Sequence, residues 1–245
     1  MSQPMRFIAF LFLCLIWGTT WIAIKFSLGG FPPFLGAAAR FSVAVLFLFA
    51  FLKMREVSLR IPLKTALLIT LTAFLMYVMD YGLIYWGEQF LNAGITAIFF
   101  ATFPLFTSIY SVWLFRSESF RLHKLIGLLL GFAGIILVFY DQLAITRFDH
   151  VIILAALAVI AGAAGGSLAV VLVKKYLSGI NSTSMAFHQM LQGIFFLLLF
   201  SFFLENWRDI HPTLPAISAV FYLGILGSAV AFAIYYWLLT SLSAV

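Results

Sequence analysis

The chain has 245 residues, of which 64% are hydrophobic and 9% are charged, and its mean hydropathy is +1.14. Soluble domains carry about 25% charged residues, and this sequence has too little polar surface to cover its apolar side chains in water. These values exclude a soluble globular enzyme and a disordered chain, and they indicate a protein surrounded mainly by lipid. The net charge of +6 lies in small basic clusters between apolar runs, which indicates a bilayer surface rather than nucleic acid as the partner.

Eight segments are apolar over the roughly 20 residues that a membrane-spanning helix needs. In chain order they are residues 7–28, 32–52, 63–87, 93–115, 122–140, 151–173, 183–204 and 214–240. The sequence lacks the alternation of apolar and polar residues that is typical of a membrane β-barrel. We therefore expect an all-α polytopic membrane protein whose consecutive helices are antiparallel neighbours.

Lysine and arginine are unevenly divided between the two sets of helix ends. Three lie at one set, Lys25, Arg147 and Arg208, whereas the other set holds Arg6, Lys53, Arg55, Arg60, Lys64, Arg116, Arg121, Lys124, Lys174 and Lys175. Basic residues accumulate on the cytoplasmic side of membrane proteins. The distribution predicts an inner (cell) membrane protein with its N-terminus and C-terminus in the cytoplasm.

Parts of the sequence repeat at a separation of about 150 residues. Lys25 aligns with Lys174 at an offset of 149, and Tyr85-Trp86 aligns with Tyr236-Trp237 at an offset of 151. Spans 1 to 3 thus correspond to spans 6 to 8, so that the repeating unit has five spans. Because five is odd, the second unit enters the membrane inverted. We expect units at residues 1–141 and 150–245, the second truncated after three helices in a fragment, a natural short form or a frame-shifted product.

Several short motifs follow one another in a recognisable order. They are Leu15-Ile16-Trp17-Gly18-Thr19-Thr20-Trp21 with Lys25, Arg40-Phe41, Tyr85-Trp86-Gly87, Leu91-Asn92-Ala93-Gly94, Pro104, and Glu118 ahead of Gly127, Gly131 and Gly134. In this order and spacing they resemble the drug/metabolite transporter superfamily, in particular the EamA-type permeases. The resemblance implies ten helices in two units, with helices 1–4 and 6–9 around a central substrate cavity. We therefore expect counterparts of helices 9 and 10 to be missing from this chain.

Two charged side chains fall inside predicted spans, where each costs about 2.5–3.5 kcal/mol on insertion scales. Arg40 and Asp80 both lie about seven residues from the outer end of their helices, so roughly 10 Å deep. We expect an ion pair between them that faces the bundle interior. It could be a structural bridge, or it could line the substrate route with Asp80 as a proton carrier. In the second unit, Gln189 aligns with Arg40 and Ala231 aligns with Asp80. Any proton-linked step is therefore expected only in the outer half of the membrane.

Further polar and aromatic residues extend the candidate pathway. Amphipathic rings can stack on organic solutes and still donate hydrogen bonds, and polar residues inside spans usually face protein or water. The alternatives are core packing for the rings and interhelical hydrogen bonds for the amides and for His188. Lys25 and Glu88 could pair at the outer mouth or reach the lipid headgroups. The residues assigned to the pathway are Trp17, Thr20, Trp21, Arg40, Tyr77, Asp80, Tyr81, Gln189 and Gln192.

Residues with little or no side chain are expected to govern helix contacts. Gly127, Gly131 and Gly134 in span 5, and Gly162, Gly165 and Gly166 with Ser167 in span 6, favour close approach of a neighbouring helix. Pro104 predicts a kink in span 4.

These patterns predict a secondary transporter that moves small organic metabolites, such as amino acids, by alternating access. The alternative is a non-transporting scaffold or an inactive truncated remnant. An enzyme is not expected, because the four histidines are scattered in the sequence and form no cluster with acids; no metal or cofactor is expected either. The expected partners are a small organic solute, the lipid bilayer and, as a hypothesis, a second copy of the chain; the substrate stays open.

Overall fold

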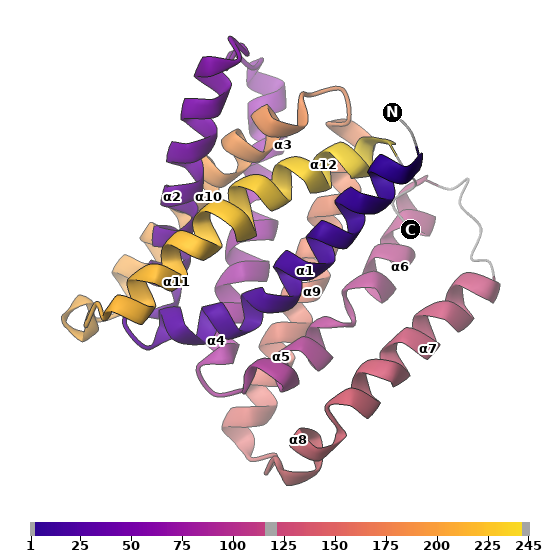
Figure 1. Cartoon of the computed structure of the whole chain (residues 1–245), viewed down its shortest axis with the longest axis vertical. Helices are drawn as coiled ribbons and strands as arrows, with labels where there is room; N and C mark the ends of the chain where they lie inside the picture. The colour runs from indigo at the N-terminus through magenta and orange to yellow at the C-terminus, as the bar shows by residue number, and fades with distance from the viewer. Residues whose placement is uncertain (1–2, 116–121, 242–245) are drawn as a thin grey trace.

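The computed structural model describes residues 3–115 and 122–241, and every regular element in these ranges is a helix (Figure 1). Arg116, Glu118 and Arg121 and the repeat residues Leu242-Ser243-Ala244 lie outside the described residues, as does the side chain of Lys124. The helices are α1 (Gln3–Leu28), α2 (Pro33–Met54), α3 (Leu63–Ala73), α4 (Leu83–Glu88), α5 (Ala93–Phe100), α6 (Phe103–Phe115), α7 (Leu122–Val138), α8 (Tyr140–Ile145), α9 (His150–Tyr176), α10 (Ser182–Leu204), α11 (Leu214–Gly224) and α12 (Ala231–Ser241).

Within residues 3–115 and 122–241, seven helical segments are long and apolar enough to cross a membrane, which agrees with a polytopic membrane protein. They are Met5–Leu28, Pro33–Met54, Leu63–Glu88, Ala93–Phe115, His150–Tyr176, Ser182–Leu204 and Leu214–Leu238. The segment expected at 122–140 is helical as α7, but α7 has 17 residues. At 1.5 Å per residue it rises about 26 Å, less than the ~30 Å hydrocarbon core. An eighth span therefore remains a prediction.

Two of the spans contain a π-helical segment in place of regular α-helix. The segment η1 (Phe74–Gly82) joins α3 to α4, and η3 (Ile225–Val230) joins α11 to α12. A π segment is rare and often marks a functional site, since it turns side chains and carbonyl groups away from their α-helical directions. The 3₁₀ turn η2 (Trp207–Asp209) lies in the connection between α10 and α11.

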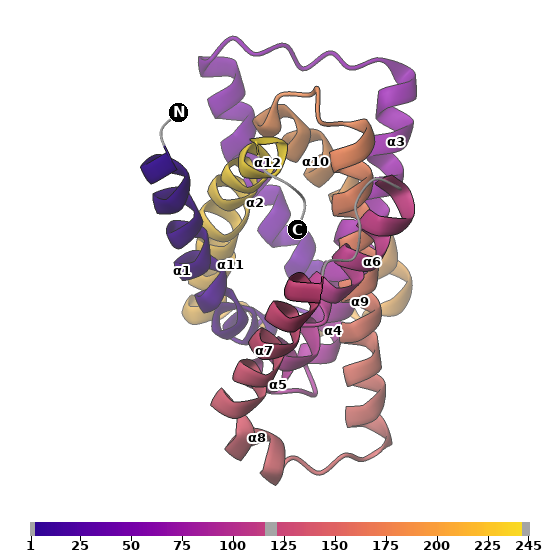
Figure 2. The same ribbon diagram turned by 90° about the vertical axis from the view of Figure 1, so that its right-hand side faces the viewer.

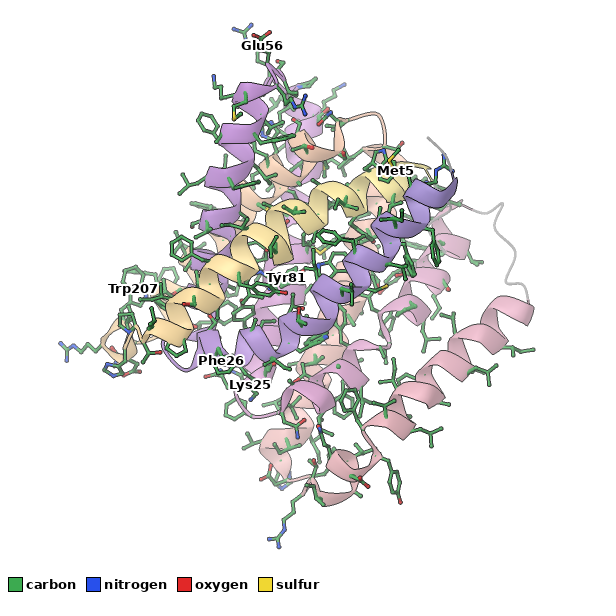
Figure 3. All side chains as sticks on the ribbon, in the orientation of Figure 1. Met5, Lys25, Phe26, Glu56, Tyr81 and Trp207 are labelled. Carbon is green, nitrogen blue, oxygen red and sulfur yellow. The ribbon has the colours of Figure 1, made fainter. Side chains whose placement is uncertain are left out.

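Segments far apart in the sequence pack together in the bundle. The indigo α1 runs beside the yellow α11 and α12, α2 packs on α10, and η1 packs on α9 (Figures 1 and 2). Met5 and Glu56 lie at one end of the bundle, Lys25 and Trp207 at the opposite end, and Tyr81 between them (Figure 3). We call the second end the Gly30 end, because the amide of His211 there donates to the carbonyl of Gly30.

The glycine predictions have different outcomes in α9 and α7. In α9 the expected close approach is confirmed, because a methyl group at Gly162 or Gly165 would meet Met79 or its neighbours at about 3 Å. In α7, nothing in the described structure lies within 4 Å of where a methyl group would stand on Gly127, Gly131 or Gly134. The sequence predicted a close neighbour there, but α7 lies at the edge of the bundle (Figure 1).

The kink expected at Pro104 is present as a break between α5 and α6. Helix α5 ends at Phe100, and α6 begins at Phe103 after a turn. Proline has no N–H to continue the helical hydrogen bonds. Next to this break, the carbonyl of Phe103 accepts a hydrogen bond of 2.8 Å from the hydroxyl of Ser167 in α9.

Helix α2 is capped by a residue from the second half of the chain. It begins after Pro32, which provides no side-chain cap. The amides of Phe34 and Leu35 donate to the two carboxylate oxygens of Glu205, at 2.6 and 3.0 Å. Because a carboxylate at a helix N-terminus also interacts favourably with the helix dipole, Glu205 ties the end of α10 to the start of α2.

Replacing Glu205 by alanine should lower the free energy of unfolding by about 1–2 kcal/mol, the usual effect of losing an N-terminal cap. Thermal unfolding of the purified protein in detergent measures the change. Asp209→Ala is the matched control, since Asp209 is exposed near the same helix end. Equal destabilisation by the two substitutions would contradict the capping role.

Candidate functional site

Arg40 connects the two halves of the chain inside the bundle. It is 1% exposed, its Nε donates to Ser228 Oγ at 2.8 Å, and its Nη2 donates to the carbonyl of Gly227 at 3.1 Å. Its guanidinium carbon lies 4.8 Å from the centroid of the Tyr81 ring and 5.1 Å from that of Phe41. The charge is therefore held by neutral acceptors and two aromatic faces.

Two residues of α1 contact Gly227 of η3, whose carbonyl also accepts from Arg40. The indole Nε1 of Trp17 donates to Gly227 O at 3.3 Å, and the methyl group of Thr20 packs beside Gly227. The structure therefore brings the predicted Trp17, Thr20 and Arg40 together. Trp21 points elsewhere, since its ring contacts Phe100 of α5 at 5.2 Å.

Tyr77 and Tyr81 form an aromatic wall on η1. Their rings are stacked with centroids 6.0 Å apart, and the ring of Phe41 meets them edge-on at 4.6 and 4.9 Å. Phe232 of α12 contacts both tyrosines. The two rings thus pack against Phe41 and Phe232 inside the bundle, and their place on a substrate pathway stays a prediction.

Asp80 lies on the side of η1 that faces α9. It is 2% exposed, and a methyl group at Gly166 would lie 2.5 Å from its Oδ2. In the described part of the chain no ion pair joins Asp80 to Arg40, because Arg40 donates to η3 instead. The expected direct pair is therefore not formed, although Arg40 is the charged group that acts on Asp80 from nearby.

The two glutamines of α10 face different neighbours. Gln189 is fully buried, and its Oε1 accepts a hydrogen bond from the hydroxyl of Tyr236. Gln192 accepts a hydrogen bond of 2.5 Å from Thr70 of α3. Only Gln189 thus lies beside the aromatic cluster, by which we mean the rings of Phe41, Tyr77, Tyr81, Phe232 and Tyr236. Gln192 instead forms an interhelical hydrogen bond, which was the alternative that the sequence left open.

Lys25 and Glu88 adopt neither of the arrangements expected for them. The Nζ of Lys25 donates to the main-chain carbonyl of Glu88, not to its carboxylate. The side chain of Glu88 is 0% exposed, so it does not reach a headgroup region. Sequence reasoning missed this burial because Glu88 stands at the end of a predicted span, where charged residues are usually solvated.

Several buried polar atoms of this region have no hydrogen-bond partner in the described structure. Most buried polar groups in proteins are paired, so these groups are the ones available to bind a solute or water. Around the aromatic cluster they are Arg40 Nη1, Tyr77 OH, Asp80 Oδ1 and Gln189 Nε2. Among the described residues, no group of three or more His, Cys, Asp or Glu side chains is arranged to hold a metal ion.

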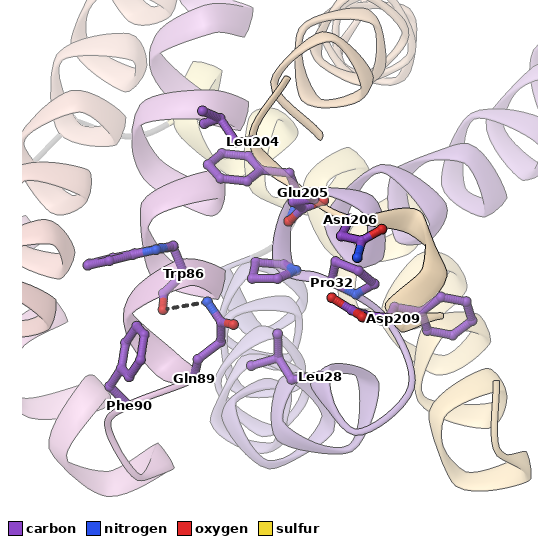
Figure 4. Close-up of a pocket in the computed structure, with 12 residues that line it drawn as sticks. Leu28, Pro32, Trp86, Gln89, Phe90, Leu204, Glu205, Asn206 and Asp209 are labelled. Atoms are coloured by element: carbon purple, nitrogen blue, oxygen red, sulfur yellow. Dashed lines mark hydrogen bonds between the residues drawn. The ribbon is translucent and has the colours of Figure 1, made fainter. Parts of the chain in front are cut away.

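A separate pocket of about 380 Å³ opens at the Gly30 end (Figure 4). It lies between the α1–α2 turn, the end of α4 and the connection after α10, and its polar lining residues are Gln89, Glu205, Asn206 and Asp209. The Nε2 of Gln89 donates to the carbonyl of Trp86 at 3.2 Å. None of the predicted pathway residues lines this pocket.

Comparison with known proteins decides the family. The model of the EamA-like transporter family matches residues 5–140 and 153–245. The chain belongs to this family. The resemblance seen in the sequence motifs is therefore confirmed, and with it the assignment to a family of membrane transporters in the drug/metabolite transporter superfamily.

Bacterial relatives of this EamA-like chain carry transporter names. It is 27% identical over 94% of its length to the uncharacterized transporter YoaV of Bacillus subtilis, covering 78% of that protein. It is 29% identical to YvbV of the same organism, also an uncharacterized transporter, over 94% of this chain and 73% of that protein. The uncharacterized inner membrane transporter YedA of Escherichia coli is 35% identical over 51% of this chain and 40% of its own.

A solved crystal structure shares the fold of this EamA-like chain. Its TM-score is 0.76 over 96% of this chain and 79% of the other, at 21% sequence identity. At that identity the likeness extends to the fold alone.

Proposed function

We propose that the protein is a secondary transporter that moves small organic metabolites, such as amino acids, across the membrane by alternating access. The observation that carries the proposal is the set of unpartnered atoms on Arg40, Tyr77, Asp80 and Gln189. Together they offer donors for a carboxylate or carbonyl and an acceptor for an amino or hydroxyl group. The rings of Phe41, Tyr81 and their neighbours provide the apolar walls that such a site needs.

Two observations support an inverted repeat as the basis of alternating access. The π segments η1 and η3 begin at Phe74 and Ile225, which differ by the same 151 positions as the aligned Tyr-Trp pairs. The two ranges matched by the family lie close to the proposed units, residues 1–141 and 150–245. Inverted units are common in secondary transporters because they give inward-open and outward-open states of similar energy.

The proposed setting is the inner (cell) membrane, with both termini of the chain in the cytoplasm. The name of YedA, an inner membrane transporter, supports the membrane. The basic residues Arg6, Lys53, Arg55 and Arg60 support the orientation, which places the Gly30 end outside. A homodimer stays a prediction.

Proteoliposomes containing the purified protein should take up one or more members of a panel of amino acids and related metabolites. Mass spectrometry of the liposome contents measures this uptake. If Asp80 carries the coupled proton, Asp80→Asn should remove the dependence of uptake on an imposed pH gradient, because an amide cannot release a proton. Asp209→Asn, which changes an exposed aspartate, should keep that dependence.

An unchanged response to the gradient in Asp80→Asn would reject the proton role. Absence of uptake for every solute, compared with empty liposomes, would favour the scaffold or remnant alternative.

A further inference from the structure

Glu88 is a buried carboxyl group without a hydrogen-bond partner. It is the last residue of α4, its side chain is 0% exposed, and both Oε1 and Oε2 lack a partner in the described structure. The nearby Lys25 does not fill this role, because its Nζ donates to the main-chain carbonyl of the same residue. Lys25 thus binds the main-chain carbonyl of Glu88 and leaves the carboxyl group without a hydrogen-bond donor.

The position is costly for a permanent negative charge. A buried ion without a partner carries a large desolvation penalty. In addition, α3, η1 and α4 form one continuous helix over Leu63–Glu88, whose C-terminus is the negative end of the helix dipole. That end attracts the ammonium of Lys25 and repels a carboxylate. A bound proton removes both penalties.

The groups around Glu88 come from three helices. The charges that act on it are Lys25 of α1 and Arg40 of α2, while α9 faces the neighbouring Gly87 with Ala155 and Val159. Tyr85, on the same helix α4, also interacts electrostatically with Glu88. Tyr77, Asp80 and Tyr81 are the titratable groups of the adjoining η1, and the exposed His150 begins α9. The carboxyl group of Glu88 thus has two cations near it, and neither donates a hydrogen bond to it.

We propose that Glu88 is a second proton-binding site of this protein, separate from Asp80. The two acids lie on one continuous helix, eight residues and about 12 Å apart along its axis. When the proton leaves Glu88, the ammonium of Lys25 exchanges the carbonyl for the carboxylate. When the proton returns, the contact seen here is restored.

Helix α1 links the change of partner at Lys25 to the site around Arg40. Lys25 lies on the same helix, α1, as Trp17 and Thr20, which contact Gly227. A change in the contact between α1 and α4 at the Gly30 end is therefore transmitted along α1 to that site. This consequence rests on the proposed transport function, whereas proton binding at Glu88 does not.

Infrared difference spectroscopy of the purified full chain in lipid nanodiscs, recorded during a pH titration, tests the proposal without any solute. A protonated carboxyl group has a carbonyl band separate from those of carboxylates. We expect such a band at a pH at which exposed acids are ionised, and Glu88→Gln should abolish it. Asp80→Asn should leave it in place. Glu205→Gln is the matched control, because both carboxylate oxygens of Glu205 accept backbone hydrogen bonds, and this substitution should leave the band in place.

Glu88→Asp provides a second variant that keeps an acid at this position. It should shift the band instead of abolishing it, which identifies the band even if Glu88→Gln folds poorly. If both substitutions leave every protonated-carboxyl band unchanged, Glu88 is not a proton-binding site. That result would leave the transport proposal standing, since no flux is measured in this experiment.

Discussion

Replacing Arg40 by glutamine should reduce solute flux by about tenfold or more. Arg40 makes two charge-assisted hydrogen bonds, to Ser228 and Gly227, and each such bond is worth about 1.5–3 kcal/mol. Losing them separates α2 from η3 and removes the free Nη1 donor from the proposed site. Flux in proteoliposomes, normalised to the amount of folded protein, measures the effect.

Arg40→Lys should not restore flux, because one ammonium cannot reproduce a planar group that binds two acceptors and lies against two rings. Arg60→Gln is the control, since Arg60 is an exposed arginine in the connection between α2 and α3. Full flux in Arg40→Lys would mean that positive charge alone is needed, and full flux in Arg40→Gln would remove Arg40 from the pathway.

Replacing Gly193 by alanine should destabilise the protein by about 1–3 kcal/mol, the usual range for overpacking a core. The added methyl group would collide with Cβ, Cγ and Cδ2 of Tyr77. These atoms are at the root of a side chain that is 0% exposed and lies against Phe41, so the ring has little room to move. Thermal unfolding in detergent measures the loss.

Gly127→Ala is the matched control for Gly193→Ala. It makes the same change in α7, where nothing in the described structure lies within 4 Å of the new methyl group. Because alanine favours helix over glycine by about 0.5–1 kcal/mol, this variant should be as stable as the original or slightly more so. Similar destabilisation by both substitutions would show that Tyr77 does not pack on α10 as described.

The sequence predicts the helices well because each span is a long apolar run with turn residues at its ends. The seven described helical segments that are long and apolar enough to cross a membrane fall within a few residues of their expected bounds. The segment at 122–140 is the exception, and there a short helix satisfied the same hydropathy pattern. The π segments left no signal, because apolar composition does not distinguish π-helix from α-helix.

The sequence predicts which polar residues lie in the interior better than it predicts their contacts. Arg40, Tyr77 and Asp80 were found because polar groups inside a span stand out, and all are buried. The hydrogen-bond partner of Arg40 was not predicted, because Ser228 lies in a run of small residues that is typical of helix packing. Equal depth in the membrane also predicted an Arg40–Asp80 pair, but depth does not fix direction around a helix axis. Asp80 lies in the π-helical segment η1, where side chains depart from their α-helical directions, and its carboxyl group lies beside Gly166.

The central claim is that one buried polar site between the two halves opens to each side of the membrane in turn. Thiol labelling measures this directly in a Thr20→Cys variant, because Thr20 packs beside Gly227 and makes no hydrogen bond to Arg40. In this variant the exposed Cys14 is replaced by serine. Membrane-impermeant reagents should modify the thiol when added from either side, and a transported solute should slow both reactions. A thiol that reacts only with a lipid-soluble reagent, or from neither side, would contradict the account.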